Sequence, residues 1–164
     1  MERQLKTDQV ARVGELLKAR GETVAVAESS TGGLLAASLL SVPGASAYFL
    51  GGSVVYTLLS RRELLEISAA DVEGLTPLSE PMVERFAVRA RAQLDATWGI
   101  AELGAAGPAG ARYGHPAGTC VLAVVGPLTL STTVQTGSED REANMWEFTA
   151  AAITLLEQAL SSSG

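Results

Sequence analysis

A cluster of hydroxyl and carboxyl side chains beside two glycines is the part of this sequence best suited to chemistry. It comprises Glu28, Ser29, Ser30, Thr31, Gly32 and Gly33. An apolar run with β-formers precedes the cluster and a leucine- and alanine-rich segment follows it, which predicts a strand that turns sharply into a helix. The N–H groups at a helix start favour an anion or a developing oxyanion, so these side chains are candidates for nucleophile and ligand contact. The alternative is a simple helix N-cap, a common role of Ser and Thr at such a position.

The elements that would position this cluster alternate along the chain. We expect helices over residues 8–20, 33–41, 60–67, 79–97 and from after 140 to about 160, and strands over 23–27, 53–56, 99–104, 118–125 and 128–136. The last two strands are separated by Gly126-Pro127, which predicts a hairpin. This order predicts an α/β fold, a three-layer α/β/α sandwich with a mixed β-sheet, as a single domain over residues 1–164. A long Gly/Pro/Ala loop over 104–116 is of the kind that often carries function.

Composition excludes several classes of protein. With 47% hydrophobic and 18% charged residues in 164, the chain is long and apolar enough to bury a core. A net charge of -6 argues against a direct nucleic-acid partner. The lone Cys120 excludes an internal disulfide and a multi-cysteine metal site, and its apolar surroundings indicate an inert core thiol. No secretion signal or membrane-spanning run is evident, so we expect a cytoplasmic protein with no membrane partner.

Several dispersed motifs are similar to those of one known family. Ala27–Gly33 is similar to A-E-S-C-T-G-G, and Phe49–Tyr56 to F-x-x-G-x-V-x-Y. Ala106-Gly107-Pro108 followed by Pro116–Thr119 is similar to G-I-A-G-P…K-P-V-G-T, and residues 137–141 to a P-G-D-R stretch before the last helix. On these motifs the chain resembles the CinA C-terminal domain family, whose single-domain members act as nicotinamide-nucleotide amidases. The family fold, a three-layer sandwich with a mixed sheet, agrees with the expected order of elements.

The resemblance implies hydrolysis of the amide of nicotinamide mononucleotide to nicotinic acid mononucleotide and ammonia, with no metal and no cofactor. Ser29 would be the nucleophile, Tyr56 a polar partner, and the N–H groups around Thr31-Gly32-Gly33 the oxyanion donors. It further implies ligand contacts by Glu28, Ser30, Thr31, Gly32, Gly33, Gly107 and Arg141. The implied partner is a pyridine nucleotide or similar anion, and family members commonly form homo-oligomers. The family name records a link to competence and DNA damage, which in an acidic protein would run through protein partners.

The sequence departs from the family pattern where the catalytic base is expected. Arg61 stands at the position of the family's lysine and Leu58 at that of an asparagine. A guanidinium stays protonated and cannot act as a base, although it can bind a phosphate bidentately. Met145 replaces a second arginine, and His115 replaces a lysine.

Two functions therefore stay open. One is an amidohydrolase acting on a carboxamide C–N bond, with Arg61 at the catalytic position and with Lys18, or a group from a neighbouring subunit, as a substitute base. The other is a catalytically inactive homologue that binds a nucleotide-like anion or a protein partner through the same pocket.

Overall fold

The computed structural model of the chain describes residues 7–112 and 114–164 and contains a five-stranded mixed sheet. The strands are β1 (Val24–Glu28), β2 (Phe49–Val54), β3 (Trp98–Ala105), β4 (Thr119–Val125) and β5 (Thr129–Gln135). Their order across the sheet is β2-β1-β3-β4-β5. Strand β1 pairs in parallel with β2 and β3, whereas β4 pairs antiparallel with β3 and β5. The late hairpin that makes the sheet mixed is confirmed.

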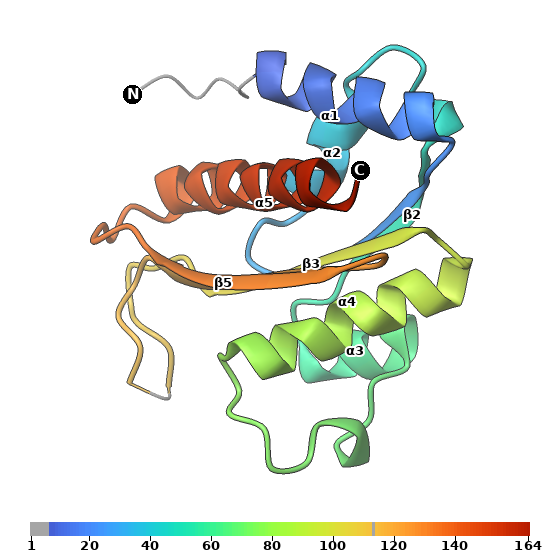
Figure 1. Cartoon of the computed structure of the whole chain (residues 1–164). Coiled ribbons are helices and arrows are strands. Elements are labelled where there is room, and N and C mark those ends of the chain that lie inside the picture. The colour runs from blue at the N-terminus through green and yellow to red at the C-terminus, as the bar shows by residue number, and fades with distance from the viewer. Residues whose placement is uncertain (1–6, 113) are drawn as a thin grey trace.

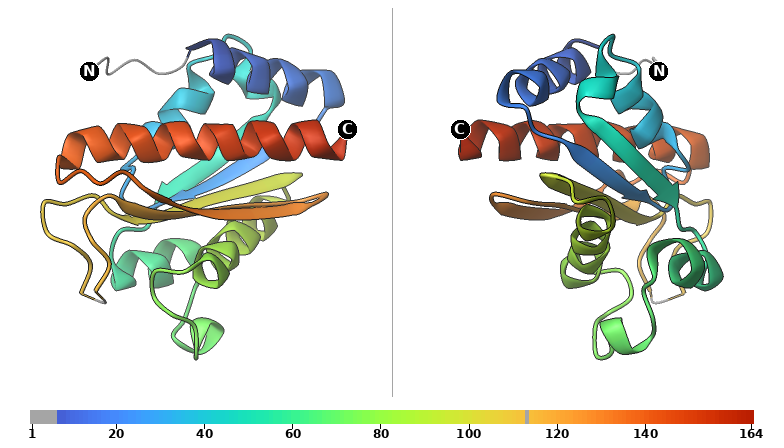
Figure 2. Two further views of the ribbon diagram at one scale, coloured as in Figure 1. Left: turned by 60° about the vertical axis from the view of Figure 1, so that its left-hand side comes forward. Right: turned by 90° about the vertical axis from the view of Figure 1, so that its right-hand side faces the viewer.

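Helices cover both faces of the sheet (Figures 1 and 2). On one face lie α1 (Thr7–Arg20), α2 (Leu34–Leu40) and α5 (Arg141–Ser163), and on the other lie α3 (Leu58–Leu65) and α4 (Glu80–Leu94). Two short 3-10 turns, η1 (Ala45–Ala47) and η2 (Ala70–Val72), belong to the connections. The fold is thus the three-layer α/β/α sandwich that the sequence predicted. Within the described ranges, no helix has both the length and the apolarity needed to cross a bilayer.

The strands bury side chains on both faces, which separates two hydrophobic clusters. Val24 and Val26 of β1 belong to the cluster under α1, α2 and α5, whereas Ala25 and Ala27 belong to the cluster under α4. Cys120 of β4 is fully buried in the first cluster, and burial raises the pKa of its thiol well above the usual value. This agrees with the expected inert core cysteine.

Strand β2 lies earlier in the chain than the sequence predicted. It ends at Val54, and the Val55 N–H makes the last hydrogen bond to β1, to the carbonyl of Glu28 at 2.7 Å. The register between β1 and β2 skips Leu50, so the expected irregularity near Gly51-Gly52 is present. A Cβ at Gly52 would lie 2.9 Å from the carbonyl oxygen of Val26, so the close backbone approach needs glycine there.

Capping residues explain the helix boundaries. The Ser79 hydroxyl accepts a hydrogen bond from the Met82 N–H, which confirms the expected N-cap of α4. Thr57 and Ser60 form a capping box, so α3 begins two residues earlier than predicted. Helix α4 ends at Leu94 rather than near 97, with the next residue in the left-handed conformation.

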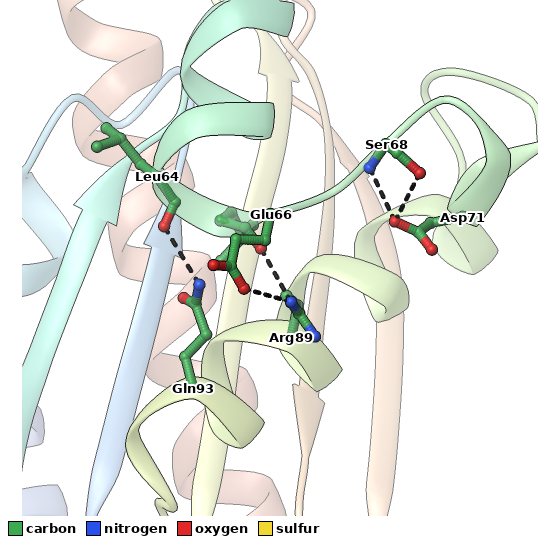
Figure 3. Close-up of polar contacts among 7 residues, drawn as sticks. Leu64, Glu66, Ser68, Asp71, Arg89 and Gln93 are labelled. Atoms are coloured by element: carbon green, nitrogen blue, oxygen red, sulfur yellow. Dashed lines mark hydrogen bonds and ion pairs between the residues drawn. The ribbon is translucent and has the colours of Figure 1, made fainter.

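Polar contacts attach α3 to α4 and to the segment that follows α3 (Figure 3). Arg89 donates to the carbonyl of Leu65 at 3.1 Å and forms an ion pair with Glu66 at 2.5 Å. Hydrogen bonds from Ser68 hold the pKa of the Asp71 carboxyl below its usual value. The bond from Arg89 to Leu65 holds the C-terminal end of α3, the helix that carries Arg61, against α4.

Candidate functional site

The hydroxyl-rich loop between β1 and α2 is held from one end by the buried carboxylate of Glu28. Its oxygens accept hydrogen bonds from the N–H groups of Gly33, Leu35 and Ala36 at 3.1, 2.9 and 3.0 Å, and the Thr31 Oγ1 lies 2.6 Å from one of these oxygens. These donors are the unpaired groups at the start of α2. Glu28 therefore satisfies the turn itself, which is one of the roles that a carboxylate at this position can take.

A second buried carboxylate, Glu102 of the neighbouring strand β3, also binds this loop. It accepts hydrogen bonds from the N–H groups of Ser29, Ser30 and Thr31 at 3.0, 3.1 and 3.0 Å. The hydroxyls of Ser30 and Thr31 also donate to it, the latter at 2.8 Å. Glu102 was not among the predicted site residues. Its signal was a single charge inside an otherwise apolar strand, which is costly unless donors surround it.

The electrostatics of Glu102 reflect its complete burial. Removal from water raises the pKa of its carboxyl, while the hydrogen bonds from Ser30, Ser29 and Thr31 act in the opposite direction without cancelling it. The Cys120 thiol, 3.9 Å away, also donates to it. The carboxyl is thus surrounded by hydrogen-bond donors, although its charged form is costly in this position.

The N–H groups expected to serve as oxyanion donors already have acceptors in the chain. The Thr31 N–H bonds Glu102, the Gly32 N–H bonds the carbonyl of Ser29 at 3.2 Å, and the Gly33 N–H bonds Glu28. An oxyanion at this loop would therefore depend on side-chain donors. The N–H groups of these three residues thus take part in holding the loop together, and their role toward a ligand stays a prediction.

A cavity of about 370 Å³ opens beside the loop, at the carboxyl ends of the parallel strands. Figure 2 shows the long β3–β4 connection projecting at the end of the sheet where α5 begins. The lining residues come from the β1–α2 loop, the β2–α3 turn, α3, the connection before α4, β3, the β3–β4 loop and α5: Ser29, Ser30, Tyr56, Arg61, Pro77, Leu78, Leu103, Gly104, Ala105, Ala106, Gly107, Ala109, Gly110, Ala111, Arg112 and Arg141.

The cavity brings together part of the predicted site. Six predicted residues line it, namely Ser29, Ser30, Tyr56, Arg61, Gly107 and Arg141. Four others, namely Glu28, Thr31, Gly32 and Gly33, do not line it and lie within or behind the loop. The sequence analysis did not name Arg112, which lines the cavity from the long glycine-rich loop.

Arginines dominate the charge of the cavity. Among its described lining residues, the ionisable side chains are Tyr56, Arg61, Arg112 and Arg141. Arg141 donates to the carbonyl of Gly107 at 2.6 Å and to the Tyr56 hydroxyl at 3.2 Å. The Arg61 guanidinium lies 5.0 Å from the centre of the Phe86 ring. Clustered guanidinium groups of this kind suit a phosphate or carboxylate.

Ser29 faces this cavity without a base beside it. Its side chain lines the cavity, and no described residue forms a hydrogen bond with its hydroxyl. In the described part of the chain, the buried polar atoms without partners belong to Glu22 and Trp98, so solvent in the cavity reaches the Ser29 Oγ. Lys18, considered as a substitute base, instead pairs with Glu15 at 2.7 Å and does not line the cavity.

The remaining sequence departures lie outside the cavity. His115 and Met145 are not among its lining residues. No group of three or more His, Cys, Asp or Glu side chains in the described ranges is arranged to hold a metal ion.

In open α/β sheets, small-molecule sites commonly lie in a crevice at the carboxyl ends of the parallel strands, which is where this cavity lies. The sequence model of the CinA C-terminal domain family matches residues 6–160, and this chain belongs to that family. A CinA-like protein of Acaryochloris marina is 46% identical over 115 residues, which cover 70% of this chain and 27% of that protein. A CinA-like protein of Synechocystis is 39% identical over 134 residues, covering 82% of this chain and 32% of that protein. The chain thus spans about a quarter to a third of the length of these curated relatives.

Solved structures of the family have the same fold. A competence-damaged protein (CinA) superfamily protein from Klebsiella pneumoniae 700603 superposes with a TM-score of 0.89 at 29% identity, covering 97% of this chain and 99% of that one. A superfamily protein from Escherichia coli gives a TM-score of 0.86 at 26% identity, covering 95% and 93%.

Proposed function

We propose that this chain binds nicotinamide mononucleotide, or a similar anionic pyridine nucleotide, in the arginine-lined cavity and hydrolyses its amide. The observation that carries the proposal is the meeting of the Ser29 hydroxyl with Arg61, Arg112 and Arg141 around one cavity. The guanidinium groups suit a phosphate, and the hydroxyl suits attack on a carbonyl. The motif resemblance supplies the choice of ligand.

In the proposed reaction, the Ser29 Oγ attacks the amide carbon and loses its proton. The C–N bond then breaks, the nitrogen takes a proton and leaves as ammonia, and water hydrolyses the resulting ester to the carboxylate. Arg61 cannot accept the proton from Ser29, since its guanidinium is already protonated. In this chain the proton would pass to water in the cavity, so we expect slow turnover.

A catalytically silent pocket that only binds the nucleotide is the second candidate. The observation that favours it is the absence, among the described lining residues, of any carboxylate, lysine or histidine that could act as a base. The pocket would keep its arginines and its affinity for a phosphate while losing the reaction.

Two measurements on the same protein separate these candidates. Incubation with nicotinamide mononucleotide, followed by assay of ammonia and nicotinic acid mononucleotide, reports hydrolysis. A ligand-dependent rise in melting temperature reports binding. Hydrolysis that disappears in Ser29→Ala supports the amidase. A thermal shift without hydrolysis, together with a gain of activity in Arg61→Lys, supports the silent pocket. If nicotinamide mononucleotide causes no thermal shift and is not hydrolysed, both candidates are wrong.

A further inference from the structure

The two serines that line the cavity have different environments. The Ser30 hydroxyl donates to the buried carboxylate of Glu102, whereas the Ser29 hydroxyl forms no hydrogen bond with any described residue. Thr31, next in the chain, also gives its hydroxyl to Glu102. One serine is therefore turned to an internal partner and the other is left for a ligand.

We propose that Glu102 is a positioning residue, which with the Ser30 hydroxyl locks the loop so that the Ser29 hydroxyl is presented to the cavity. We call the contacts of Glu102 with Ser29, Ser30 and Thr31 the lock. The inference rests on the proposed function in one respect, that Ser29 is the residue that contacts the ligand. Glu102 does not line the cavity, so it acts through the loop.

The backbone contacts explain why the lock fixes orientation. Three consecutive N–H groups converge on one carboxylate, so the peptide planes from Ser29 to Thr31 are all constrained. Each of these residues is buried, and water has little access to replace the bonds. A loop constrained at three successive planes holds the intervening side-chain directions, because Cβ directions follow the backbone.

The strand beneath the loop is shaped to accept the lock. A Cβ on Gly104 would lie 2.6 Å from the Ser30 Oγ and 2.9 Å from the Phe148 ring, so a side chain there would displace the hydroxyl or the ring. The bare backbone at Gly104 leaves the Ser30 hydroxyl room to reach Glu102, two residues earlier on β3. Glycine at this position is thus needed by the lock.

Cysteine substitution tests the orientation without any need for turnover. Ser29→Cys and Ser30→Cys variants are alkylated with iodoacetamide and followed by intact mass. The wild-type chain serves as background, since its Cys120 is fully buried. Ser29 and Ser30 are about equally exposed, at 6% and 5%, so a difference in rate reports the direction of the side chain. A thiol turned toward Glu102 is withheld from the reagent, and we expect Ser29→Cys to react at least about tenfold faster than Ser30→Cys. Equal rates, or faster reaction at Ser30→Cys, would overturn the lock.

Adding Glu102→Gln to each cysteine variant tests the carboxylate itself. Glutamine keeps one acceptor oxygen but places an NH2 group where the other oxygen accepted, so the loop loses the bonds to that oxygen and the difference in rate should narrow to about threefold or less. A difference that persists in soluble, folded double variants contradicts the role of Glu102. Where Glu102→Gln prevents folding, Gly104→Ala takes its place, since the added methyl group would displace the Ser30 hydroxyl and should also narrow the difference.

Kinetics supply a readout that a merely structural role would not change. For ammonia release from nicotinamide mononucleotide, Ser30→Ala should lower kcat about tenfold with KM nearly unchanged, because orientation affects the transition state. The matched control is Ser38→Ala, a buried serine of α2 that donates to the carbonyl of Leu34, with kcat unchanged. If the wild type binds the nucleotide without releasing ammonia, the proposed hydrolysis fails, and the alkylation rates alone decide the lock.

Discussion

The two walls of the cavity differ in how their side chains are held. The serine wall consists of Ser29 and Ser30, which are buried, and their N–H groups together with that of Thr31 donate to the Glu102 carboxylate. The arginine wall consists of Arg61, Arg112 and Arg141, of which the last two are exposed. Buried hydrogen bonds are costly to break, whereas exposed cations contribute little to folding. The serine wall should therefore govern geometry and stability, and the arginine wall should govern affinity for an anion.

The largest expected effect is that of Glu102→Ala on the serine wall. The substitution removes the acceptor of three buried N–H groups, so the free energy of unfolding should fall by about 3 kcal/mol or more. Urea denaturation measures it. The matched control is Glu80→Ala, whose carboxylate accepts from Ser131 and Thr133 at 2.8 and 2.7 Å near the surface, with an expected loss of about 1 kcal/mol. If the free energy of unfolding falls equally in the two variants, burial does not strengthen the contribution of the Glu102 hydrogen bonds to stability.

Glu28→Ala should have a smaller effect than Glu102→Ala, although both carboxylates are buried. Gly33 and Ala36, two of the residues whose N–H groups Glu28 accepts, are only partly buried, so water can replace those bonds. We expect a loss of about 2 kcal/mol, in the upper range for a helix cap. The same urea titration measures it. A loss larger than that of Glu102→Ala would reverse the ranking of the two carboxylates.

The two carboxylates also show why the contacts of Glu28 with the loop could be predicted from the sequence and those of Glu102 could not. Glu28 lies within eight positions of every donor that it accepts, so the sequence places it at the turn. Glu102 meets Ser30 across 72 positions, and only the pairing of β1 with β3 brings them together. A charged residue in an apolar strand signals a buried partner but does not identify it. Such contacts follow from topology and register.

The arginine wall likewise contains residues that the sequence predicted and one that it did not. Alternating elements and a late hairpin were enough to predict the layers and the mixed sheet. Arg61 and Arg141 were predicted through motifs that lie at the ends of elements. Arg112 lies in the long glycine-rich loop, whose path no periodicity describes, so its place in the cavity required the structure.

A pH titration tests the electrostatic side of the serine wall. Burial raises the folded-state pKa of Glu102 above the ordinary glutamate value of 4.5, so the folded protein binds this proton more tightly than the unfolded chain. The contribution of this carboxyl to stability is fully present below about 4.5 and is lost as pH rises through the raised pKa. The free energy of unfolding of wild type minus that of Glu102→Gln should therefore fall as pH rises from 4.5. A difference that grows with pH would mean that the hydrogen bonds from the loop outweigh burial.

The smallest effect on stability is expected in the arginine wall, at Arg112. The side chain is exposed, so Arg112→Ala should leave the free energy of unfolding within about 0.5 kcal/mol of wild type. The dissociation constant for nicotinamide mononucleotide should rise about fivefold, since one charged contact with a phosphate is lost. Calorimetric titration at low and high salt measures it, and the wild-type advantage should shrink at high salt because exposed charges are screened.

Arg12→Ala is the matched control for net charge. Arg12 pairs with Glu157 at 3.1 Å between α1 and α5 and does not line the cavity, so its removal changes the overall charge equally. If both variants weaken binding to the same extent, the long-range field of the protein attracts the nucleotide and the arginine wall makes no local contact. If Arg112→Ala alone weakens binding, and does so without loss of stability, the two walls act separately: one shapes the site and the other attracts its ligand.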